Sequence, residues 1–396
     1  MNNENKLVPK FRFKEFEGNG EWEEKALGEV FTSFSGGTPS TTQKIYYGGN
    51  IPFIRSAEIN KTSTELFLTE LGLKNSSAKM VSKGDLLVAL YGANSGDVAI
   101  SKIDGAINQA ILCLKSEFSN TFIYHFLSGK KDWIVSKYIQ GGQGNLSGEI
   151  VKSISVLFPT TQEQQKIAAC LSSLDEVIAG ESQKLELLKE HKKGLLQNLF
   201  PQDGETVPKL RFPEFKDNGE WELMQISNIL NAESSNLALN KLELKQSGYA
   251  VYGADSIVGY IENFQHKEPY ISIVKDGSGV GRLNLCDGET STLGTLSSLK
   301  SKDEKKYKVV WAYYLLNTID FSSYVKGSGI PHIYFSDYKS ENIGVPKTEE
   351  QQKIASCLSS LDDLIAAQSQ KIETLKLHKK GLLQGLFPPV KEVSNG

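Results

Sequence analysis

Two stretches of the chain share one pattern of apolar and polar positions. From about 161 to 200, leucines and isoleucines recur at alternating intervals of four and three residues, and the pattern returns from about 348 to 387. A seam of this kind, sustained over about five heptads, is typical of a coiled coil and predicts two long helices. The apolar seam positions are Ile167, Leu171, Leu174, Ile178, Leu185, Leu188, Leu195 and Leu199 in the first stretch and Ile354, Leu358, Leu361, Ile365, Ile372, Leu375, Leu382 and Leu386 in the second.

Local signals mark both ends of each predicted helix. A threonine followed three residues later by a glutamine predicts a capping box at each start, formed by Thr161 with Gln164 and by Thr348 with Gln351. A proline directly after each stretch ends the helix. At a rise of roughly 1.5 Å per residue, about 38 residues give a helix roughly 57 Å long. Each helix could instead pack only on its own domain, but the length and narrowness of the seam favour pairing of the two helices.

The two helices belong to a larger internal repeat. Aligning 163–200 with 350–387 gives 29 identities in 38 positions, and the segment VPKFRFKEFEGNGEWE at 8–23 returns as VPKLRFPEFKDNGEWE at 207–222. The chain therefore consists of two copies of an entry segment, a variable region and a long helix. Because the second entry segment directly follows the first helix, antiparallel helices would place each variable region beside the start of its own helix and the end of the other. Parallel helices would need long returns.

The variable regions, about 23–159 and 222–346, contain short β-like runs separated by glycines and asparagines. In the first region the runs lie at 51–59, 85–92, 97–103 and 107–114, followed by a helix at about 121–136 and a glycine-rich loop at 140–149. In the second they lie at 248–254, 257–262 and 270–283, followed by a helix at 309–319 and a loop at 326–335. The order of parts is the same although the residues differ, which indicates one architecture with two different surfaces.

We therefore predict an α+β fold in which two β-rich globular domains are separated by two long antiparallel helices that form an intramolecular coiled coil. The repeat gives this fold pseudo-two-fold symmetry. The predicted boundaries are 1–159 for the first domain with its entry segment, 160–200 for the first helix, 201–347 for the linker and second domain, and 348–396 for the second helix and tail.

Composition narrows the class of protein. The chain has 396 residues, a net charge of -3 and four cysteines without close spacing. No apolar run approaches the roughly 18 residues that span a bilayer, and the first residues contain no signal-peptide core, so we expect a cytoplasmic protein without disulfides or a metal site. The stretch 23–159 has 13 Lys and Arg against 12 Asp and Glu, and the stretch 222–347 has 13 against 14. Binding to a polyanion would therefore need clustered cations or help from a partner.

The sequence favours a chain without catalytic activity. It contains no phosphate-binding P-loop, no dinucleotide fingerprint that opens a helix and no Asn-Pro-Pro-aromatic box of an amino-methyltransferase. The glycines at 277, 279 and 281 lie between β-like runs, which predicts a hairpin turn. The five histidines do not have the spacing of metal ligands.

Loops of both variable regions carry polar side chains beside glycines. Such side chains can contact base edges and phosphates where glycine lets the backbone approach a duplex. The alternative is that turns of any β-rich domain contain these residue types. The candidate DNA-binding residues are Thr38, Ser40, Lys44, Tyr46, Tyr47, Arg55, Ser56, Asn94, Ser95 and Asn145 in the first region and Tyr252, Lys275, Ser278, Arg282, Lys326, Ser328, His332 and Tyr334 in the second.

The chain resembles the specificity subunits of type I restriction–modification systems over essentially its whole length. The most specific motifs are EQQKIA at 163–168 and KKGLLQ-x-LFP from 192, with their copies from 350 and 379. SGGTPS at 35–40, IPFIR at 51–55 and INQAIL at 107–112 are also typical of the family's recognition domains. The usual proline-leucine-alanine before EQQ is replaced by other residues after Pro159 and Pro346, and the second region lacks GGTPS.

The resemblance implies a non-catalytic DNA sequence-specificity subunit. Each variable region would be a target recognition domain that reads one half of a bipartite asymmetric site in double-stranded DNA, while the helices set the spacer. Two methyltransferase (modification) subunits would dock on the helices, and two translocase–nuclease (restriction) subunits would complete the complex. The chain itself would bind no cofactor, because S-adenosylmethionine, ATP and Mg belong to the partner subunits.

Two other functions remain open at this stage. A coiled-coil adaptor that assembles other proteins without reading DNA would explain the near-neutral charge. A nuclease or methyltransferase in its own right is disfavoured by the missing motifs.

Overall fold

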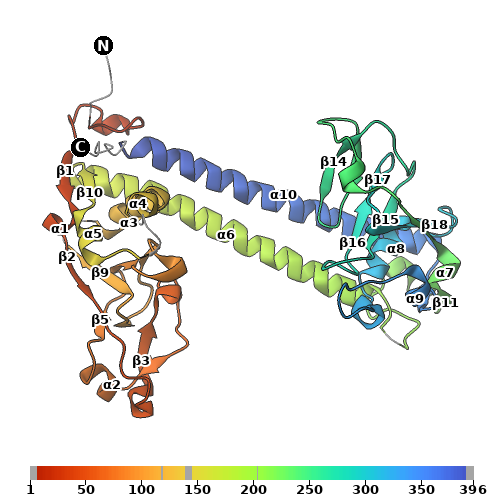
Figure 1. Cartoon of the computed structure of the whole chain (residues 1–396), viewed down its shortest axis with the longest axis horizontal. Coiled ribbons are helices and arrows are strands. Elements are labelled where there is room, and N and C mark those ends of the chain that lie inside the picture. Colours follow the sequence, from red (N-terminus) through yellow and green to blue (C-terminus); the bar gives the residue numbers. More distant parts are fainter. Residues whose placement is uncertain (1–6, 117–118, 139–144, 203, 389–396) are drawn as a thin grey trace. The chain divides into compact units, whose positions relative to one another are not determined.

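The computed structural model describes residues 7–116, 119–138, 145–202 and 204–388 (Figure 1). Contacts divide the chain into two units. The first unit combines Met1–Ser182 with Gln370–Gly396, and the second unit is Gln183–Ser369. Each unit therefore contains one variable region, the start of the helix that follows it and the end of the other helix.

The variable region of the first unit folds into a β-rich domain. Its strands are β1 (Glu23–Ala26), β2 (Thr32–Ser35), β3 (Tyr47–Ile54), β4 (Phe67–Leu68), β5 (Lys79–Val81), β6 (Leu86–Ala89), β7 (Val98–Ile100), β8 (Gly105–Ile107), β9 (Ile111–Lys115) and β10 (Ser155–Phe158). Its helices are α1 (Leu27–Val30), α2 (Glu70–Lys74), α3 (Asn120–Gly129), α4 (Lys131–Tyr138) and α5 (Gly148–Ser153). The sheets have the orders β2-β9-β6-β7, β4-β3-β8-β5 and β1-β10.

The second unit contains a domain of the same kind. Its strands are β11 (Glu222–Gln225), β12 (Leu230–Ser234), β13 (Tyr249–Tyr252), β14 (Ile257–Ile261), β15 (Tyr270–Val274), β16 (Leu283–Cys286), β17 (Ser291–Thr292), β18 (Leu296–Ser301) and β19 (Asn342–Val345). Its helices are α7 (Ile226–Ile229), α8 (Val309–Leu316) and α9 (Phe335–Tyr338). The sheets have the orders β12-β18-β15-β16, β14-β13-β17 and β11-β19. Among the described strands, each domain has one parallel pair, β3 with β8 and β13 with β17.

The long helices are α6 (Thr161–Leu199) and α10 (Thr348–Leu386). In the first unit Asp175 pairs with Lys379 and Glu181 with Lys371, so moving forward along α6 moves backward along α10. The predicted α+β class with two antiparallel helices that pack together is therefore confirmed. The alternative in which each helix packs only on its own domain is wrong. All sixteen apolar seam positions are buried or half-buried.

The hydrophobic cores show what each helix pair packs against. In the first unit, Trp22 and Phe122 of the domain share a core with Leu171 of α6 and with Phe387 just after α10. Trp22 and Phe387 make an edge-to-face contact with ring centroids 6.4 Å apart. In the second unit, Phe200 and Trp221 repeat this contact at 6.2 Å. Each domain thus joins the start of one helix to the end of the other.

Several local predictions need correction. The run 107–114 is divided between β8 and β9, which belong to different sheets, and the run 51–59 leaves the sheet after Ile54. The helix predicted at 121–136 is divided at Lys130 into α3 and α4. The hairpin at 277–281 is confirmed by the antiparallel pairing of β15 with β16.

The predicted capping boxes are wrong. In α6 the capping side chain is Thr160, one residue earlier, whose Oγ1 accepts a hydrogen bond from Glu163 N at 3.4 Å. The Gln164 side chain instead donates to the carbonyl of Pro159 at 3.0 Å, and Gln351 donates to Pro346 in the same way at 2.9 Å. Within the described ranges, no helix has the length and apolar character needed to cross a membrane.

Candidate nucleic-acid interface

The glycine pair of the first region lies against the end of β8. A Cβ on Gly36 would lie 1.8 Å from the carbonyl oxygen of Ile107, so glycine is required there, and Gly37 N donates to that oxygen at 3.2 Å. The Thr38 hydroxyl donates to Gln109 Oε1. The contact therefore joins two of the motifs named above, SGGTPS and INQAIL. Gln109 belongs to the candidate site, although sequence reasoning did not select it.

Other candidates surround this contact. The Tyr47 hydroxyl donates to the carbonyl of Pro39 at 2.7 Å, and the hydroxyls of Ser40 and Thr42 are hydrogen-bonded at 2.8 Å. Lys44 is exposed and forms no ion pair with any residue that the structure describes. A lysine held at the edge of a rigid loop in this way is available to a phosphate.

Arg55 is engaged by two carboxylates. Its Nε donates to Glu58 at 2.8 Å and its Nη2 donates to Glu65 at 2.5 Å. These hydrogen bonds raise the pKa of Arg55 above its usual range, so the guanidinium stays charged. Because Glu58 is buried, Arg55 stabilises the turn after β3. Tyr46 and Ser56 are half-buried.

The turn between β6 and β7 meets the segment before α5. Leu146 N donates to the carbonyl of Leu90 at 2.8 Å, and the buried Ser95 hydroxyl donates to that carbonyl at 2.9 Å. Ser95 therefore holds two loops together. The exposed Asn145 accepts a hydrogen bond from Gly92 N at 3.3 Å, and Asn94 is half-buried in the same turn. Of the predicted loop at 140–149, residues 140–144 lie outside the described residues.

In the second unit, the turn 275–282 pairs with the hairpin 326–332. Ile333 N donates to Lys275 O at 2.8 Å, and Lys326 and His332 exchange backbone hydrogen bonds at 2.9 and 2.8 Å. This pairing gathers most of the candidates of the second region, namely Lys275, Ser278, Arg282, Lys326, Ser328, His332 and Tyr334.

The cations of this group differ in whether a carboxylate already pairs with them. Lys275 has no ion-pair partner among the described residues. Arg282 pairs with Asp255, and Lys326 pairs with Asp337 at 2.6 Å, which lowers the pKa of Asp337. In the Arg282–Asp255 pair both side chains are exposed, and exposed pairs contribute only about 0–1 kcal/mol. A phosphate could therefore displace Asp255 at little cost, whereas the Asp337 side chain is only 10% exposed.

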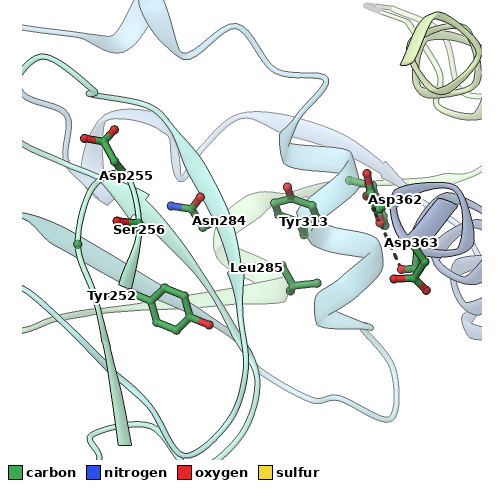
Figure 2. Close-up of a pocket in the computed structure, with 11 residues that line it drawn as sticks. Tyr252, Asp255, Ser256, Asn284, Leu285, Tyr313, Asp362 and Asp363 are labelled. Atoms are coloured by element: carbon green, nitrogen blue, oxygen red, sulfur yellow. Dashed lines mark hydrogen bonds between the residues drawn. The ribbon is translucent and has the colours of Figure 1, made fainter. Parts of the chain in front are cut away.

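Tyr252 lines a cavity of about 390 Å³ that borders this group, because Asp255, the partner of Arg282, lines it too. Figure 2 shows Tyr252 and Asn284 of the β-rich domain on one side, Asp362 and Asp363 of α10 on the other, and Tyr313 of α8 between them. In the described chain the lining has three aspartates and no Lys or Arg, so it disfavours a phosphate. The lining residues are Tyr252, Gly253, Asp255, Ser256, Asn284, Leu285, Tyr313, Tyr314, Ser359, Asp362 and Asp363.

One backbone frame supports the loops of both domains. Leu90 accepts from Leu146 N, and Lys275 accepts from Ile333 N, both at 2.8 Å. On the other side, Leu90 N donates to a carbonyl before β9 at 2.8 Å, and Lys275 N donates to a carbonyl before β18 at 2.9 Å. The turns that follow β6 and β15 therefore occupy equivalent places, although their side chains are unrelated.

A polar contact that sequence reasoning missed joins the first domain to α6. His125 of α3 is hydrogen-bonded through Nε2 to the Ser172 hydroxyl at 3.1 Å, and its Nδ1 lies 3.9 Å from Asp175. Burial, with help from the nearby charge of Lys379, lowers the pKa of His125 to about 4. The ring is therefore neutral near pH 7.

The second domain makes the corresponding contact with α10. The Tyr314 hydroxyl of α8 donates to Ser359 at 3.2 Å and to Asp362 at 2.7 Å. Ser359 and Asp362 are the repeat equivalents of the serine and aspartate that His125 meets. Each aspartate also pairs with a lysine of the other long helix at 2.5 Å. The sequence did contain a signal for these contacts. The serine and the aspartate are identical in the two helix copies although they lie off the apolar seam.

Comparison with known proteins places this geometry in a family. The model for the type I restriction modification DNA specificity domain matches twice, over residues 19–190 and 218–377. The chain is 26% identical to the type I restriction enzyme MjaIX specificity subunit of Methanocaldococcus jannaschii, with 92% of each chain covered. It is also 26% identical to the EcoR124I/EcoR124II specificity subunit of Escherichia coli, over 40% of this chain and 42% of that protein.

A solved structure has the same fold. The S subunit of a type I restriction-modification system from M. genitalium superposes with a TM-score of 0.67 at 16% identity, covering 97% of this chain and 100% of that one. A chain from a study of complex assembly and conformational transition in the type I R-M system gives a TM-score of 0.54, also at 16% identity, covering 91% and 96%.

Proposed function

This chain belongs to the type I restriction–modification DNA specificity family, and from that premise we propose that it reads a bipartite DNA site. It is a specificity subunit, so its partners are DNA and the other subunits of a restriction–modification complex. Under this proposal each β-rich domain reads one half of an asymmetric site, and the chain performs no catalysis. The observation that carries the proposal is the shared frame of the two domains, on which equivalent loops present unrelated side chains.

The loop geometry supports different roles for the candidates: some would contact phosphates and others would contact bases. Lys44 in the first domain and Lys275 in the second would contact phosphates, because neither is engaged by a described carboxylate. Arg282 would exchange its exposed carboxylate partner for a phosphate, and the exposed Lys326 would contact a phosphate while it stays beside Asp337. Exposed polar groups of the loops, such as Asn145 in the first domain, would face base edges.

The near-neutral charge of both domains indicates that partners supply part of the phosphate binding. Affinity for duplex DNA normally grows with the number of phosphates neutralised. We infer that two methyltransferase subunits, which bind S-adenosylmethionine, dock on the helices and add these contacts. Val177 and Leu364 are repeat equivalents with exposures of 47% and 57%, which suits two copies of one partner. Two translocase–nuclease subunits, which use ATP and Mg, would complete the complex.

Exchange of one domain tests independent reading. Replacing residues 23–159 with another recognition domain, in a host that supplies the methyltransferase subunit, should change one half of the methylated site and leave the other half and the spacer unchanged. Sequencing of methylated DNA measures both halves at once, and replacement of 222–346 is the matched control. A change in both halves, or no sequence-specific methylation by the unaltered complex, would refute the proposal.

Insertion of equal lengths into both helices tests the spacer. One heptad added to each of α6 and α10 keeps the seam in phase and adds about 10 Å. At about 3.4 Å per base pair, the spacer should grow by about 3 bp. The same heptad added to α6 alone should impair assembly, because the seams no longer match. Methylation at an unchanged spacer after the double insertion would contradict the proposal.

A further inference from the structure

Because α6 and α10 are so similar, each could pair either with the other or with its own counterpart in a second copy of the chain. Only nine of the 38 aligned positions differ, and two of these, Glu181/Gln368 and Leu185/Ile372, lie on the seam. The ion pairs of Asp175 with Lys379 and of Asp362 with Lys192 are repeat equivalents of one another. The same residues would therefore also pair if α6 met a second α6, or α10 a second α10, from another copy of the chain.

Each entry segment fastens two helix ends to one another. In the first unit, Phe11 N donates to the carbonyl of Gly385 near the end of α10 at 2.8 Å, while Arg12 makes two hydrogen bonds, at 2.9 and 2.8 Å, to Glu163 near the start of α6. We call this contact the first clasp. The side chains of Arg12 and Glu163 are 10% and 1% exposed.

The second unit repeats the arrangement with the helices exchanged. Leu210 N donates to the carbonyl of Asn198 near the end of α6 at 2.8 Å, and Arg211 makes hydrogen bonds of 2.7 and 2.8 Å to Glu350 near the start of α10. This is the second clasp. Both clasps have the same backbone and ionic contacts, so these contacts cannot distinguish one helix end from the other.

The clasps differ in one pair of side chains. At Gly385 an added Cβ would lie 2.0 Å from Cδ2 and 2.4 Å from Cε2 of the Phe11 ring, so the ring occupies the space that a side chain would need. At the equivalent position of the second clasp, Asn198 has a side chain, and the residue opposite it is the smaller Leu210. The bulky residue is on the entry segment in one clasp and on the helix end in the other.

Pairing between like helices would bring the wrong members of these pairs together. Two copies of α6 would place Phe11 over Asn198, where the ring and the side chain compete for one volume. Two copies of α10 would place Leu210 over Gly385, where a gap remains. Only the pairing of α6 with α10 matches both clasps.

We propose that Phe11 with Gly385, and Leu210 with Asn198, form a matched pair of contacts that selects the pairing of α6 with α10 over the pairing of either helix with its counterpart in a second copy of this chain. The selection matters during synthesis. The first 200 residues are made before α10 exists, and the partner then available to α6 is another α6.

The first experiment tests, in the full-length chain, whether Phe11 requires a glycine at position 385. Gly385→Asn should lower the melting temperature by about 2–4 °C, because the Phe11 ring must leave its place. Adding Phe11→Leu recreates the second clasp and should restore the melting temperature to within about 1 °C of the original chain. Unchanged melting of Gly385→Asn, or no recovery in the double variant, overturns the proposal.

The second experiment separates selectivity from stability. In the double variant Phe11→Leu/Gly385→Asn both clasps are alike, so refolding from urea should give a dimer fraction several-fold above that of the original chain. Native mass spectrometry at one fixed protein concentration measures that fraction. The matched control adds Leu210→Phe and Asn198→Gly, which exchanges the two clasps and keeps them different. This quadruple variant should return to the original dimer fraction. Equal dimer fractions in the double and quadruple variants overturn the proposal.

Discussion

The two β-rich domains attach to the same stretch of long helix with different chemistry. In the first unit a neutral imidazole, His125, meets a serine and lies near an aspartate of α6, whereas in the second unit the phenol of Tyr314 donates to the equivalent serine and aspartate of α10. The positions on the helices are constant, and the residue that the domain supplies is not. The same helix positions therefore accept a histidine from one domain and a tyrosine from the other.

The clasps show the same division between constant and variable parts. Arg12 with Glu163 and Arg211 with Glu350 have nearly the same geometry. However, Trp221 also donates to Glu350 at 3.3 Å, while the Nε1 of the equivalent Trp22 has no partner among the described residues. The repeat therefore preserves the ion pair and leaves the surrounding hydrogen bonds unequal.

The largest expected effect comes from removing a clasp arginine. Arg12→Ala should lower the free energy of unfolding by about 3–4 kcal/mol, because Glu163 is 1% exposed and would be left without its cation. Arg211→Ala should cost about 1 kcal/mol less, because Glu350 keeps the hydrogen bond from Trp221. Urea denaturation measures both. Lys at the same positions is the control and should lose less than Ala. Losses below about 1 kcal/mol for both Ala variants would show that the clasps do not hold the units.

Acid sensitivity should distinguish the two helix attachments. Unfolded histidine has a pKa of about 6.5, and that of His125 in the folded chain is about 4. The unfolded state therefore takes up a proton first, and the His125 contribution is lost as pH falls from about 7 towards 4, with no effect above pH 7. Between pH 7.5 and 5 the loss is about 2 kcal/mol.

His125→Tyr copies the attachment of the second unit. It should remove the roughly 2 kcal/mol of unfolding free energy that the original chain loses between pH 7.5 and 5 through His125. Unfolding at pH 5 and 7.5 gives the comparison. His266, whose pKa burial also lowers to about 4, remains in this variant and contributes to the residual acid sensitivity. An unchanged difference between the two pH values would show that His125 titrates normally.

Removing the phenol tests the attachment of the second unit. Tyr314→Phe should cost about 1.5 kcal/mol, because Asp362 and Ser359 lose a buried hydrogen-bond donor. Burial raises the pKa of Tyr314, so the hydroxyl is a donor at any pH used for the measurement. The neighbouring Tyr313→Phe is the control and should cost less. Equal losses in the two variants would leave Tyr314 without a special role.

Periodicity and internal repetition were sufficient to predict the class of fold. A seam on α6 and α10 needs an apolar partner, and the short connection after α6 favours the antiparallel arrangement. The predicted runs at 51–59, 85–92 and 97–103 correspond to β3, β6 and β7, because turn residues separate them, but no run was predicted for β2, β4 or β5. The break at 108–110 was not readable either, because there the chain passes from the sheet of β8 to the sheet of β9.

Side-chain partners across elements were less accessible to sequence reasoning. Arg55, selected as a loop cation, is engaged by Glu58, three residues later, and by Glu65, whose position depends on how the chain folds back after β3. His125 was visible, but its contact with Ser172 depends on how α3 packs on α6. The clasp arginines were visible only as members of a repeated segment. Residues that recur in both copies of the repeat therefore predict contacts better than residue type alone, because both copies must form the same geometry.

The smallest expected effect concerns an ion pair between the described parts of α6 and α10 that the repeat does not duplicate. Lys371 pairs with Glu181 at 2.5 Å, whereas the equivalent positions are Lys184 and the neutral Gln368. Lys371→Ala should cost less than about 1 kcal/mol, because the lysine is half exposed, and about 0.5 M salt should reduce the loss further. Lys184→Ala is the matched control and should show no such salt dependence. Denaturation of both variants at low and high salt makes the comparison. A salt-independent loss at Lys371 would mean that its aliphatic chain, rather than its charge, stabilises the helix pair.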